Sequence, residues 1–325
     1  MTDLLHLTDD SRAGGVMTNI RGMKRVDQQL GLIQHVTQVN PSNALAAREF
    51  HADIIIVHFS LAWRKLPYLV ALRALNRKSL LILQEHHYSP EHFENEPDAL
   101  KRFSLLVRGS FHLFDRVLAV SDAQTNWYKE LGCAPTGTAP PITNLDDLLV
   151  LPERAKSGHT VVGVSGRLEQ AKGIDLLLSA IRNNKDRSIH FLIAGDGELR
   201  AAVEKTAGSC ENVNYFGRYE HPIDFLSRCD QVAIPSRLDT FGLSALEAKA
   251  AGKPIVVTQT CGLPEQAQNC GVIVKRNCPE SLLRGISQLS RLNKLVELGR
   301  NARNSAKNHN TNSLQTWLQQ LQSKR

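Results

Sequence analysis

Residues 231–257 read QVAIPSRLDTFGLSALEAKAAGKPIVV, and this stretch decides the fold. Val232–Ile234 is a short apolar run that ends at a proline, which cannot continue a sheet ladder because it has no N–H. Apolar residues then recur at helical spacing from Leu243, and Gly252 followed closely by a proline ends the helix. Ile255–Val257 is the next apolar run. The pattern predicts a strand, a loop, a helix and a strand in succession, which is the repeating unit of a parallel α/β sheet.

The beginning of this predicted helix is suited to an anion. Phe241, Gly242 and Leu243 offer backbone N–H groups at the positive end of the helix dipole. Gly242 also allows a ligand to approach the backbone closely. Asp239 lies just before the helix, and Glu247 lies about two turns along it on roughly the same face. An ordinary N-capping aspartate with a solvent-facing glutamate is the simpler structural interpretation of the two acids.

An acidic residue, seven residues and then Glu, arranged around Phe-Gly and followed by Ala-Gly-Lys-Pro, resembles the retaining GT-B glycosyltransferases of family GT4. The resemblance implies that Asp239 holds the hydroxyls of the donor sugar. It implies that the amides of Phe241, Gly242 and Leu243 hold the diphosphate, and that Glu247 holds the ribose hydroxyls of the nucleotide. The family more often has Glu at the first acidic position, so the shorter Asp239 has less reach toward the sugar.

A second match to the family lies at residues 166–173, GRLEQAKG, directly after a predicted strand. Two cations at the mouth of a strand can neutralise a diphosphate and stabilise the negative charge that develops as the sugar–phosphate bond breaks. The resemblance assigns this role to Arg167 and Lys172, with Gly166 at the start of the loop. It also implies that the glycine-rich turn at Gly195 lines the nucleotide site, although such a turn alone is a plain strand-to-helix connection.

The amino-terminal half carries two weaker candidates. Gly14 and Gly15 form a turn after the first predicted strand, and such a turn can bring backbone amides to a phosphate or a sugar. The family has a similar loop facing the donor. It also carries a histidine after the strand that we predict at Ser79–Leu83, near the acceptor and the anomeric carbon. This assigns a catalytic role to His86, with His87 as the neighbour that could displace it, and a histidine there can hydrogen-bond a sugar hydroxyl or the acceptor.

The length of 325 residues is typical of two domains. The resemblance implies an α/β fold of GT-B type, in which two Rossmann-like domains with parallel sheets face an interdomain cleft. We expect an acceptor-binding domain at residues 1–150 and a nucleotide-sugar-binding domain at 151–310, with the helix at about 311–325 packing back on the first. No apolar run approaches the ~18 residues of a membrane span. The N-terminus lacks a signal-peptide pattern, and the six Cys form no C-x-x-C pair, so we predict a cytoplasmic protein with reduced thiols.

The net charge of +7 is uneven, because residues 1–150 carry −1 and residues 151–325 carry +8. A basic half suits an anionic ligand such as a nucleotide sugar, or an anionic membrane surface. The helix predicted at Ala99–Leu113 mixes cations with apolar residues, so peripheral contact with the inner membrane surface is one interpretation. Packing of that helix on the sheet is the favoured one. No aromatic-rich basic motif accompanies the charge, so we expect no nucleic-acid partner.

The resemblance implies a retaining glycosyltransferase that moves a sugar from a nucleotide-diphosphate sugar to a glycan or lipid-linked acceptor, and we expect its role in bacterial cell-surface polysaccharide or lipopolysaccharide biosynthesis. The resemblance implies no cofactor and no metal, because Arg167, Lys172 and the helix end supply the positive charge. Alternatives are a GT-B sugar-nucleotide epimerase, a phosphorylase and a non-catalytic nucleotide-binding protein. A dinucleotide-binding dehydrogenase is disfavoured, since no G-x-G-x-x-G follows the first predicted strand.

Overall fold

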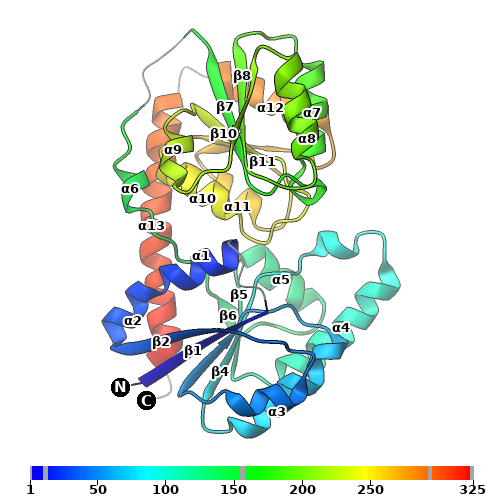
Figure 1. The fold of residues 1–325 in the computed structure, drawn as a ribbon, viewed down its shortest axis with the longest axis vertical. Coiled ribbons are helices and arrows are strands. Elements are labelled where there is room, and N and C mark those ends of the chain that lie inside the picture. The colour runs from blue at the N-terminus through cyan, green and yellow to red at the C-terminus, as the bar shows by residue number, and fades with distance from the viewer. Residues whose placement is uncertain (1, 10–13, 154–157, 292–294, 323–325) are drawn as a thin grey trace. The chain divides into compact units, whose positions relative to one another are not determined.

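The computed structural model describes residues 2–9, 14–153, 158–291 and 295–322 (Figure 1). The chain divides into two units, and each is described by itself. Unit 1 comprises Met1–Thr143 and Asn310–Arg325, and unit 2 comprises Asn144–His309. The boundary therefore lies slightly before residue 150, and the last residues of the chain are counted with unit 1.

Unit 1 is built on a sheet of six parallel strands in the order β2-β1-β3-β4-β5-β6. The sequence Ile-Ile-Ile-Val in β3 explains the parallel arrangement, because a strand that is buried on both faces is apolar at every position. The strands are β1 (Thr2–Thr8), β2 (Leu32–Gln38), β3 (Ile54–Val57), β4 (Leu80–Glu85), β5 (Arg116–Ala119) and β6 (Gly137–Thr138).

Helices cover both faces of this sheet (Figure 1). They are α1 (Gly15–Gly22), α2 (Lys24–Leu30), α3 (Leu66–Leu75), α4 (Pro97–Phe111), α5 (Asp122–Glu130) and the end of α13 (Leu295–Gln322), with 3₁₀ turns η1 (Ala44–Glu49), η2 (Trp63–Lys65) and η3 (Pro90–Phe93). Ile55 and Val57 of β3 belong to a core shared with α3, α4 and α5. Ile54 and Ile56 belong to a second core shared with α2 and α13, as the alternation of side chains along a strand requires.

Unit 2 contains a second sheet of six parallel strands, in the order β12-β11-β10-β7-β8-β9. The strands are β7 (Thr160–Ser165), β8 (Ile189–Ala194), β9 (Val213–Gly217), β10 (Gln231–Ile234), β11 (Ile255–Thr258) and β12 (Gly271–Val274). The helices are α6 (Asp146–Leu149), α7 (Ile174–Asn183), α8 (Arg200–Ser209), α9 (Pro222–Leu226), α10 (Leu243–Ala250), α11 (Leu263–Ala267) and α12 (Pro279–Arg291), with the 3₁₀ turn η4 (Gln170–Lys172). One core joins the sheet to α7, α8 and α12.

The strand, loop, helix and strand predicted at residues 231–257 are confirmed as β10, α10 and β11 with their connections. Gly252 follows α10 in the left-handed region at φ 69°, which is the conformation that a glycine at this position favours. The helix predicted at about 311–325 corresponds to the end of α13, which follows α12 in the chain. The residues between these helices and the last three of the chain lie outside the described part.

The strand that we predicted at Ser79–Leu83 extends further at its carboxyl end. We expected it to end at Leu83, but β4 continues through Gln84 to Glu85. The amide of Gln84 is buried because it accepts a hydrogen bond from Asn19 at 2.8 Å and donates one to the carbonyl oxygen of Ala139 at 3.2 Å. A polar side chain can thus lie in a central strand when its hydrogen bonds are made within the protein.

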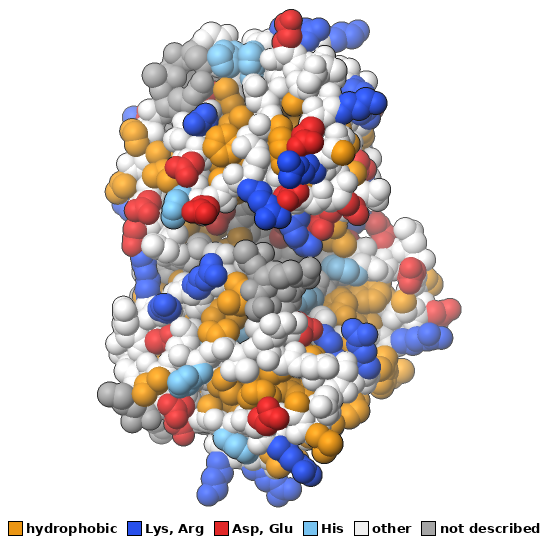
Figure 2. Space-filling model, viewed as in Figure 1, with side chains coloured by type: hydrophobic (Ala, Val, Ile, Leu, Met, Phe, Trp, Pro, Cys, Tyr) orange, Lys and Arg blue, Asp and Glu red, His pale blue; other side chains and the backbone are white. Residues whose placement is uncertain are grey.

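The helix considered as a membrane contact, α4, packs on the sheet. Phe103, Leu106 and Val107 are buried in the core of unit 1, whereas Leu105 is 63% exposed. Among the described residues, no helix combines the length and the hydropathy that a membrane span requires. On the face of unit 2 that Figure 2 shows, Lys and Arg side chains are interspersed with Asp and Glu side chains.

The end of α13 gives a test of the packing in unit 1. Trp317 is fully buried, and its indole nitrogen donates to the carbonyl oxygen of Pro140 at 3.3 Å. We expect Trp317→Ala to lower the free energy of unfolding by about 3–5 kcal/mol, because it leaves a large cavity. Gln319→Ala, on the exposed side of the same helix, should change it by less than about 0.5 kcal/mol. Urea unfolding followed by circular dichroism measures both, and equal values for the two variants would contradict the assignment.

Candidate functional site

The order of strands in unit 2 identifies the edge at which a ligand is expected. From β7 the chain continues to β8 and β9 on one side, and from β10 to β11 and β12 on the other, so the order reverses between β7 and β10. In open α/β sheets a ligand binds outside the carboxyl ends of the strands at this switch point. Residues 166–173 follow β7 and residues 235–242 follow β10, so the two stretches that resemble the family motifs flank the switch point.

Two of the predicted glycines lie directly after strands at this edge of the sheet, Gly166 after β7 and Gly195 after β8. Gly166 lies at φ 144° and Gly195 at φ 132°, a region that side chains other than glycine rarely adopt. The amide of Gly166 donates to the carbonyl oxygen of Ala194 at 3.2 Å. A Cβ atom on Gly195 would collide with the carbonyl oxygen of Gly166, so the backbones after β7 and β8 approach closely only because residue 195 is glycine.

Two of the predicted charged residues are in direct contact. Lys172, in η4, places its Nζ 2.8 Å from Oδ2 of Asp239, in the loop after β10. The same carboxylate oxygen accepts a hydrogen bond from Oγ of Ser236 at 3.4 Å. The side chains of Lys172 and Asp239 are 27% and 12% exposed, so the pair is partly shielded and remains open to a ligand.

The second predicted cation is more exposed. The guanidinium of Arg167 lies 2.9 Å from Oε2 of Glu169, and its side chain is 71% exposed. An exposed ion pair of this kind contributes little to the free energy of unfolding. Arg167 can therefore leave Glu169 and pair with an anion at little cost in stability.

Arg237, which the sequence analysis did not single out, braces the loop after β10. Its guanidinium donates two hydrogen bonds to the carboxylate of Asp175 at 2.6 and 2.9 Å, and others to the carbonyl oxygen of Gln170 and the side chain of Asn277. These hydrogen bonds hold the pKa of Asp175 below its usual value. Through Arg237, the loop that carries Asp239 is therefore joined to η4 at Gln170 and to α7 at Asp175.

The helix predicted to offer its amides begins as expected. α10 starts at Leu243, and Gly242 before it lies in the left-handed region at φ 92°. The first N–H groups of a helix have no partner within the helix, so they point outward at this end. Phe241 is buried with its ring 5.1 Å from that of His309. The packing of Phe241 fixes the entry of the chain into α10.

Glu247 is half-buried and is the fifth of the eight residues of α10. Burial raises the pKa of Glu247 to about 7, because the charged form is poorly solvated there. Burial also raises the pKa of Tyr219, with a smaller contribution from the charge of Glu247, while a hydrogen bond with Ser165 at the end of β7 opposes the shift. Glu247, Tyr219 and the end of β7 thus lie close together.

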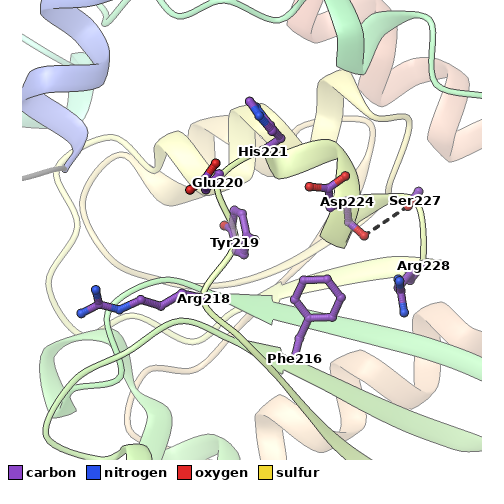
Figure 3. A pocket seen from close by; sticks show the side chains of 8 residues that line it. All are labelled: Phe216, Arg218, Tyr219, Glu220, His221, Asp224, Ser227 and Arg228. Atoms are coloured by element: carbon purple, nitrogen blue, oxygen red, sulfur yellow. Dashed lines mark hydrogen bonds between the residues drawn. The ribbon is translucent and has the colours of Figure 1, made fainter.

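Tyr219 also lines a cavity of about 580 Å³ after β9 (Figure 3). Its ring is stacked on that of Phe225 at 5.6 Å. Polar and charged side chains from α9 and the loop before it complete the lining, and the hydroxyl of Ser227 donates to the carbonyl oxygen of Asp224. The lining residues are Phe216, Arg218, Tyr219, Glu220, His221, Asp224, Ser227 and Arg228.

The remaining predicted residues belong to unit 1. Gly14 and Gly15 lie at the start of α1, and the predicted loop at residues 10–13 before them is outside the described residues. The strand order of unit 1 reverses between β1 and β3. His86 directly follows β4, the next strand along the sheet from this switch point.

His86 belongs to a cluster that the sequence analysis did not identify. Its Nε2 lies 3.1 Å from Nδ1 of His58, and Nε2 of His58 lies 2.8 Å from Nδ1 of His6. His87 is placed differently, with its ring perpendicular to that of His86 and its Nδ1 3.7 Å from Oε1 of Glu85. Within the described residues, no group of three or more His, Cys, Asp or Glu side chains is arranged to hold a metal ion.

Comparison with solved structures identifies the architecture. Sucrose-phosphate synthase of Thermosynechococcus elongatus aligns with a TM-score of 0.82 and 16% identity, covering 100% of this chain and 99% of that one. HepE of Anabaena, in a complex with UDP and glucose, aligns with a TM-score of 0.73 and 18% identity, covering 99% of this chain and 100% of that one. The protein has the GT-B fold.

The sequence comparisons match less than half of this GT-B chain. The family model of glycosyl transferases group 1 matches residues 152–309, which is most of unit 2. An uncharacterized glycosyltransferase of Methanocaldococcus jannaschii is 30% identical over 150 residues, which are 44% of this chain and 42% of the relative. The O-antigen biosynthesis glycosyltransferase WclY of Escherichia coli is 31% identical over 101 residues, 30% of this chain and 28% of the relative. The chain thus spans less than half the length of these curated relatives.

The raised pKa of Glu247 predicts a pH dependence of stability in this GT-B protein. Between about pH 4.5 and about pH 7 the folded protein keeps the proton of Glu247 while the unfolded chain has lost it. The free energy of unfolding therefore falls as the pH rises through this window. Glu247→Gln, which cannot ionise, should remove that part of the fall.

Urea unfolding across this pH window measures the effect, and carbon-13 NMR of the labelled carboxyl group gives the pKa directly. Glu211→Gln, a change at an exposed side chain, is the control and should leave the pH profile as it is. A titration of Glu247 near its ordinary 4.5, or a profile unchanged in Glu247→Gln, would be inconsistent with this assignment.

Proposed function

We propose that this protein is a retaining glycosyltransferase of family GT4 that moves a sugar from a nucleotide-diphosphate sugar to an acceptor. The observation that carries the proposal is the contact between Lys172 and Asp239 beside the start of α10, at the switch point of unit 2. The match of residues 152–309 to glycosyl transferases group 1 supports it. So does the UDP that the structural neighbour HepE binds.

The diphosphate of the donor would lie at the positive end of α10. The amides of Phe241, Gly242 and Leu243 would donate hydrogen bonds to it, and the helix dipole favours its charge. Arg167 and Lys172 would add two cations. As the sugar–phosphate bond breaks, negative charge grows on the leaving phosphate, and these groups stabilise it without having to reorganise.

The sugar and the ribose would be held by the two carboxylates. Asp239 would accept hydrogen bonds from the sugar hydroxyls, and its contacts with Lys172 and Ser236 hold it in place for this role. Glu247 would bind the ribose hydroxyls from α10, and the cavity beside Tyr219 would receive the base. In this arrangement the nucleotide runs from the end of β10 toward the end of β9.

Retention at the anomeric carbon follows if the leaving phosphate takes the proton of the incoming hydroxyl on the same face of the sugar. No nucleophile from the protein is then required. The cations and amides would supply the charge stabilisation that a divalent ion supplies in other transferases, so we expect turnover without added metal. In unit 1, we propose that His86 hydrogen-bonds a sugar hydroxyl or the acceptor, and that Gly14 and Gly15 lie near the donor.

We further propose that the acceptor is a glycan or lipid-linked glycan of bacterial cell-surface polysaccharide or lipopolysaccharide biosynthesis. The similarity to a relative named for O-antigen biosynthesis supports this choice. The enzyme would work in the cytoplasm, with peripheral contact at the inner membrane surface. A sugar-nucleotide epimerase would instead convert the donor without an acceptor, and a non-catalytic binding protein would bind the nucleotide without turnover.

The diphosphate site is tested by removing its cations. We expect Lys172→Ala and Arg167→Ala each to weaken binding of a nucleoside diphosphate about 10- to 100-fold, because each loses hydrogen bonds to a charged group worth about 1.5–3 kcal/mol. Lys205→Ala removes an exposed cation of α8 and should leave binding unchanged. Calorimetry with UDP, GDP and ADP measures the affinities. The proposal fails if the variants bind as the unaltered protein does, or if that protein binds none of the three.

The role of Asp239 is tested by an isosteric pair of variants. Asp239→Asn keeps the shape of the side chain but loses its charge, so we expect kcat to fall about 10- to 100-fold. Asp239→Glu restores the residue more usual in the family and should keep most of the activity. Turnover of a panel of nucleotide sugars with and without acceptor provides the measurement, and equal activity of Asp239→Asn and the unaltered protein would refute the role.

A further inference from the structure

Unit 1 carries an ion pair at its own switch point. Asp9 directly follows β1, and Lys65 is the last residue of η2, which follows β3. Nζ of Lys65 lies 2.7 Å from Oδ2 of Asp9. The two strands are neighbours in the sheet, and the strand order reverses between them. The pair thus lies where an open α/β sheet binds a ligand, as the pair of Lys172 and Asp239 does in unit 2.

Lys65 is buried, and all of its donors are engaged. Its side chain is 4% exposed. The ammonium group donates to three oxygens, which are Oδ2 of Asp9 at 2.7 Å and the carbonyl oxygen and Oγ of Ser60, each at 2.9 Å. An ammonium group has three N–H donors, so these contacts use all of them. Lys65 can therefore act on a ligand only through the carboxylate that it holds.

Asp9 is held at one oxygen and is open at the other. Its side chain is 29% exposed, in contrast to that of Lys65. Within the described part of the chain, Oδ1 of Asp9 accepts no hydrogen bond. A carboxylate offers both of its oxygens as acceptors and has no donor of its own. Oδ1 can therefore accept a hydrogen bond from a ligand while Oδ2 stays with Lys65.

The charges of this pair favour a neutral donor group. The ammonium of Lys65 balances the carboxylate of Asp9, so the pair has no net charge and a cationic ligand gains little from it. A hydroxyl group can donate to Oδ1 without bringing a charge. A hydrogen bond of this kind is stronger than one between two neutral groups, because the acceptor is ionised. The pair therefore suits a hydroxyl group of a sugar.

Tyr88, which follows β4, lies beside this pair. Its hydroxyl donates to the carbonyl oxygen of Leu61 at 2.8 Å. Burial raises the pKa of Tyr88, and the charges of Glu85 and, less strongly, of Asp9 add to this shift, while a hydrogen bond with Ser60 opposes it. The segments that follow β1, β3 and β4 therefore meet at the pair, and three parts of the chain build this edge of the sheet.

We propose that Asp9 binds the acceptor, with Oδ1 accepting a hydrogen bond from a hydroxyl group of a pyranoside, and that Lys65 is the positioning residue that fixes the carboxylate. The identity of this ligand as the acceptor rests on the proposed function, whereas the binding of a pyranoside does not. The role adds to the one proposed for His86, which directly follows β4 at the same edge.

Asp9→Asn tests the binding. The asparagine side chain keeps an oxygen for Nζ of Lys65 and places an amide NH₂ group where Oδ1 was, so the ammonium stays satisfied while the open acceptor is lost. Ligand-observed NMR titrations of the full chain with the methyl glycosides of glucose, galactose, mannose and N-acetylglucosamine give the dissociation constants. We expect at least one of them to bind the unaltered protein. Asp9→Asn should weaken that binding about 10- to 100-fold, because a hydrogen bond to a charged group is lost.

Asp53→Asn is the matched control. Asp53 is exposed and directly precedes β3, so it lies at the opposite edge of the same sheet. This variant should bind the glycoside as the unaltered protein does.

Lys65→Met tests the positioning role. Methionine has no ammonium group, so Asp9 loses its anchor and the same glycoside should bind about 10-fold more weakly. Because the two residues act as a unit, Lys65→Met combined with Asp9→Asn should bind no more weakly than the weaker single variant. An ion pair with a structural role alone would change the free energy of unfolding and leave the dissociation constant of the folded protein as it is.

The proposal is overturned if none of the four glycosides binds the unaltered protein, or if Asp9→Asn or Lys65→Met binds as that protein does. If either variant does not fold, carbon-13 NMR of the unaltered protein decides. A bound hydroxyl group should shift the labelled carboxyl signal of Asp9 and not that of Asp53. The titrations need no nucleotide, so their failure is distinct from a failure of the glycosyltransferase proposal, which calorimetry with UDP, GDP and ADP tests.

Discussion

Parallel pairing of the strands is the constraint on which the structure depends. In a parallel sheet every strand ends at the same edge, so the loops that follow the strands meet there although they are distant in sequence. Where the strand order reverses, neighbouring loops diverge and leave room for a ligand. Unit 2 reverses between β7 and β10 and unit 1 between β1 and β3, and the chemically distinctive side chains of each unit lie at these points.

The contact of Lys172 with Asp239 shows what this constraint produces in unit 2. The two residues are joined across the switch point at 2.8 Å, and both remain partly exposed. A pair of this kind adds little stability, because solvent screens it and two flexible side chains are ordered. The pair nevertheless places a cation and a carboxylate side by side at the switch point. Arg237, held by Asp175 and by the backbone of Gln170, supplies the rigidity that the pair itself does not.

The helices and strands of the motif at residues 231–257 could be predicted from the sequence. The hydrogen-bond partners of several side chains near the sites could not. Continuous apolar runs predicted β10 and β11, and the Gly-Lys-Pro sequence predicted the end of α10. These signals can be read from the sequence because they depend on residues that are neighbours in the chain. The end of β4 was missed because Gln84 reads as a loop residue until Asn19 is seen to satisfy its amide. His6 was missed for a related reason. It stands inside an apolar strand, and its partner His58 is brought to it only by the pairing of β1 with β3.

The two units place different side chains at the same kind of sheet edge. The edge of unit 2 carries cations and the first amides of α10, and the ion pair of Arg167 with Glu169 is exposed and contributes little stability. The edge of unit 1 carries three stacked histidine rings, of which His6 and His58 are buried. Burial disfavours the charged form in both units, because it raises the pKa of Glu247 and lowers the pKa of His58. Because burial favours the neutral form of an acid and of a base alike, the charge at the edge of unit 2 comes from its more exposed side chains, Arg167, Lys172 and Asp239.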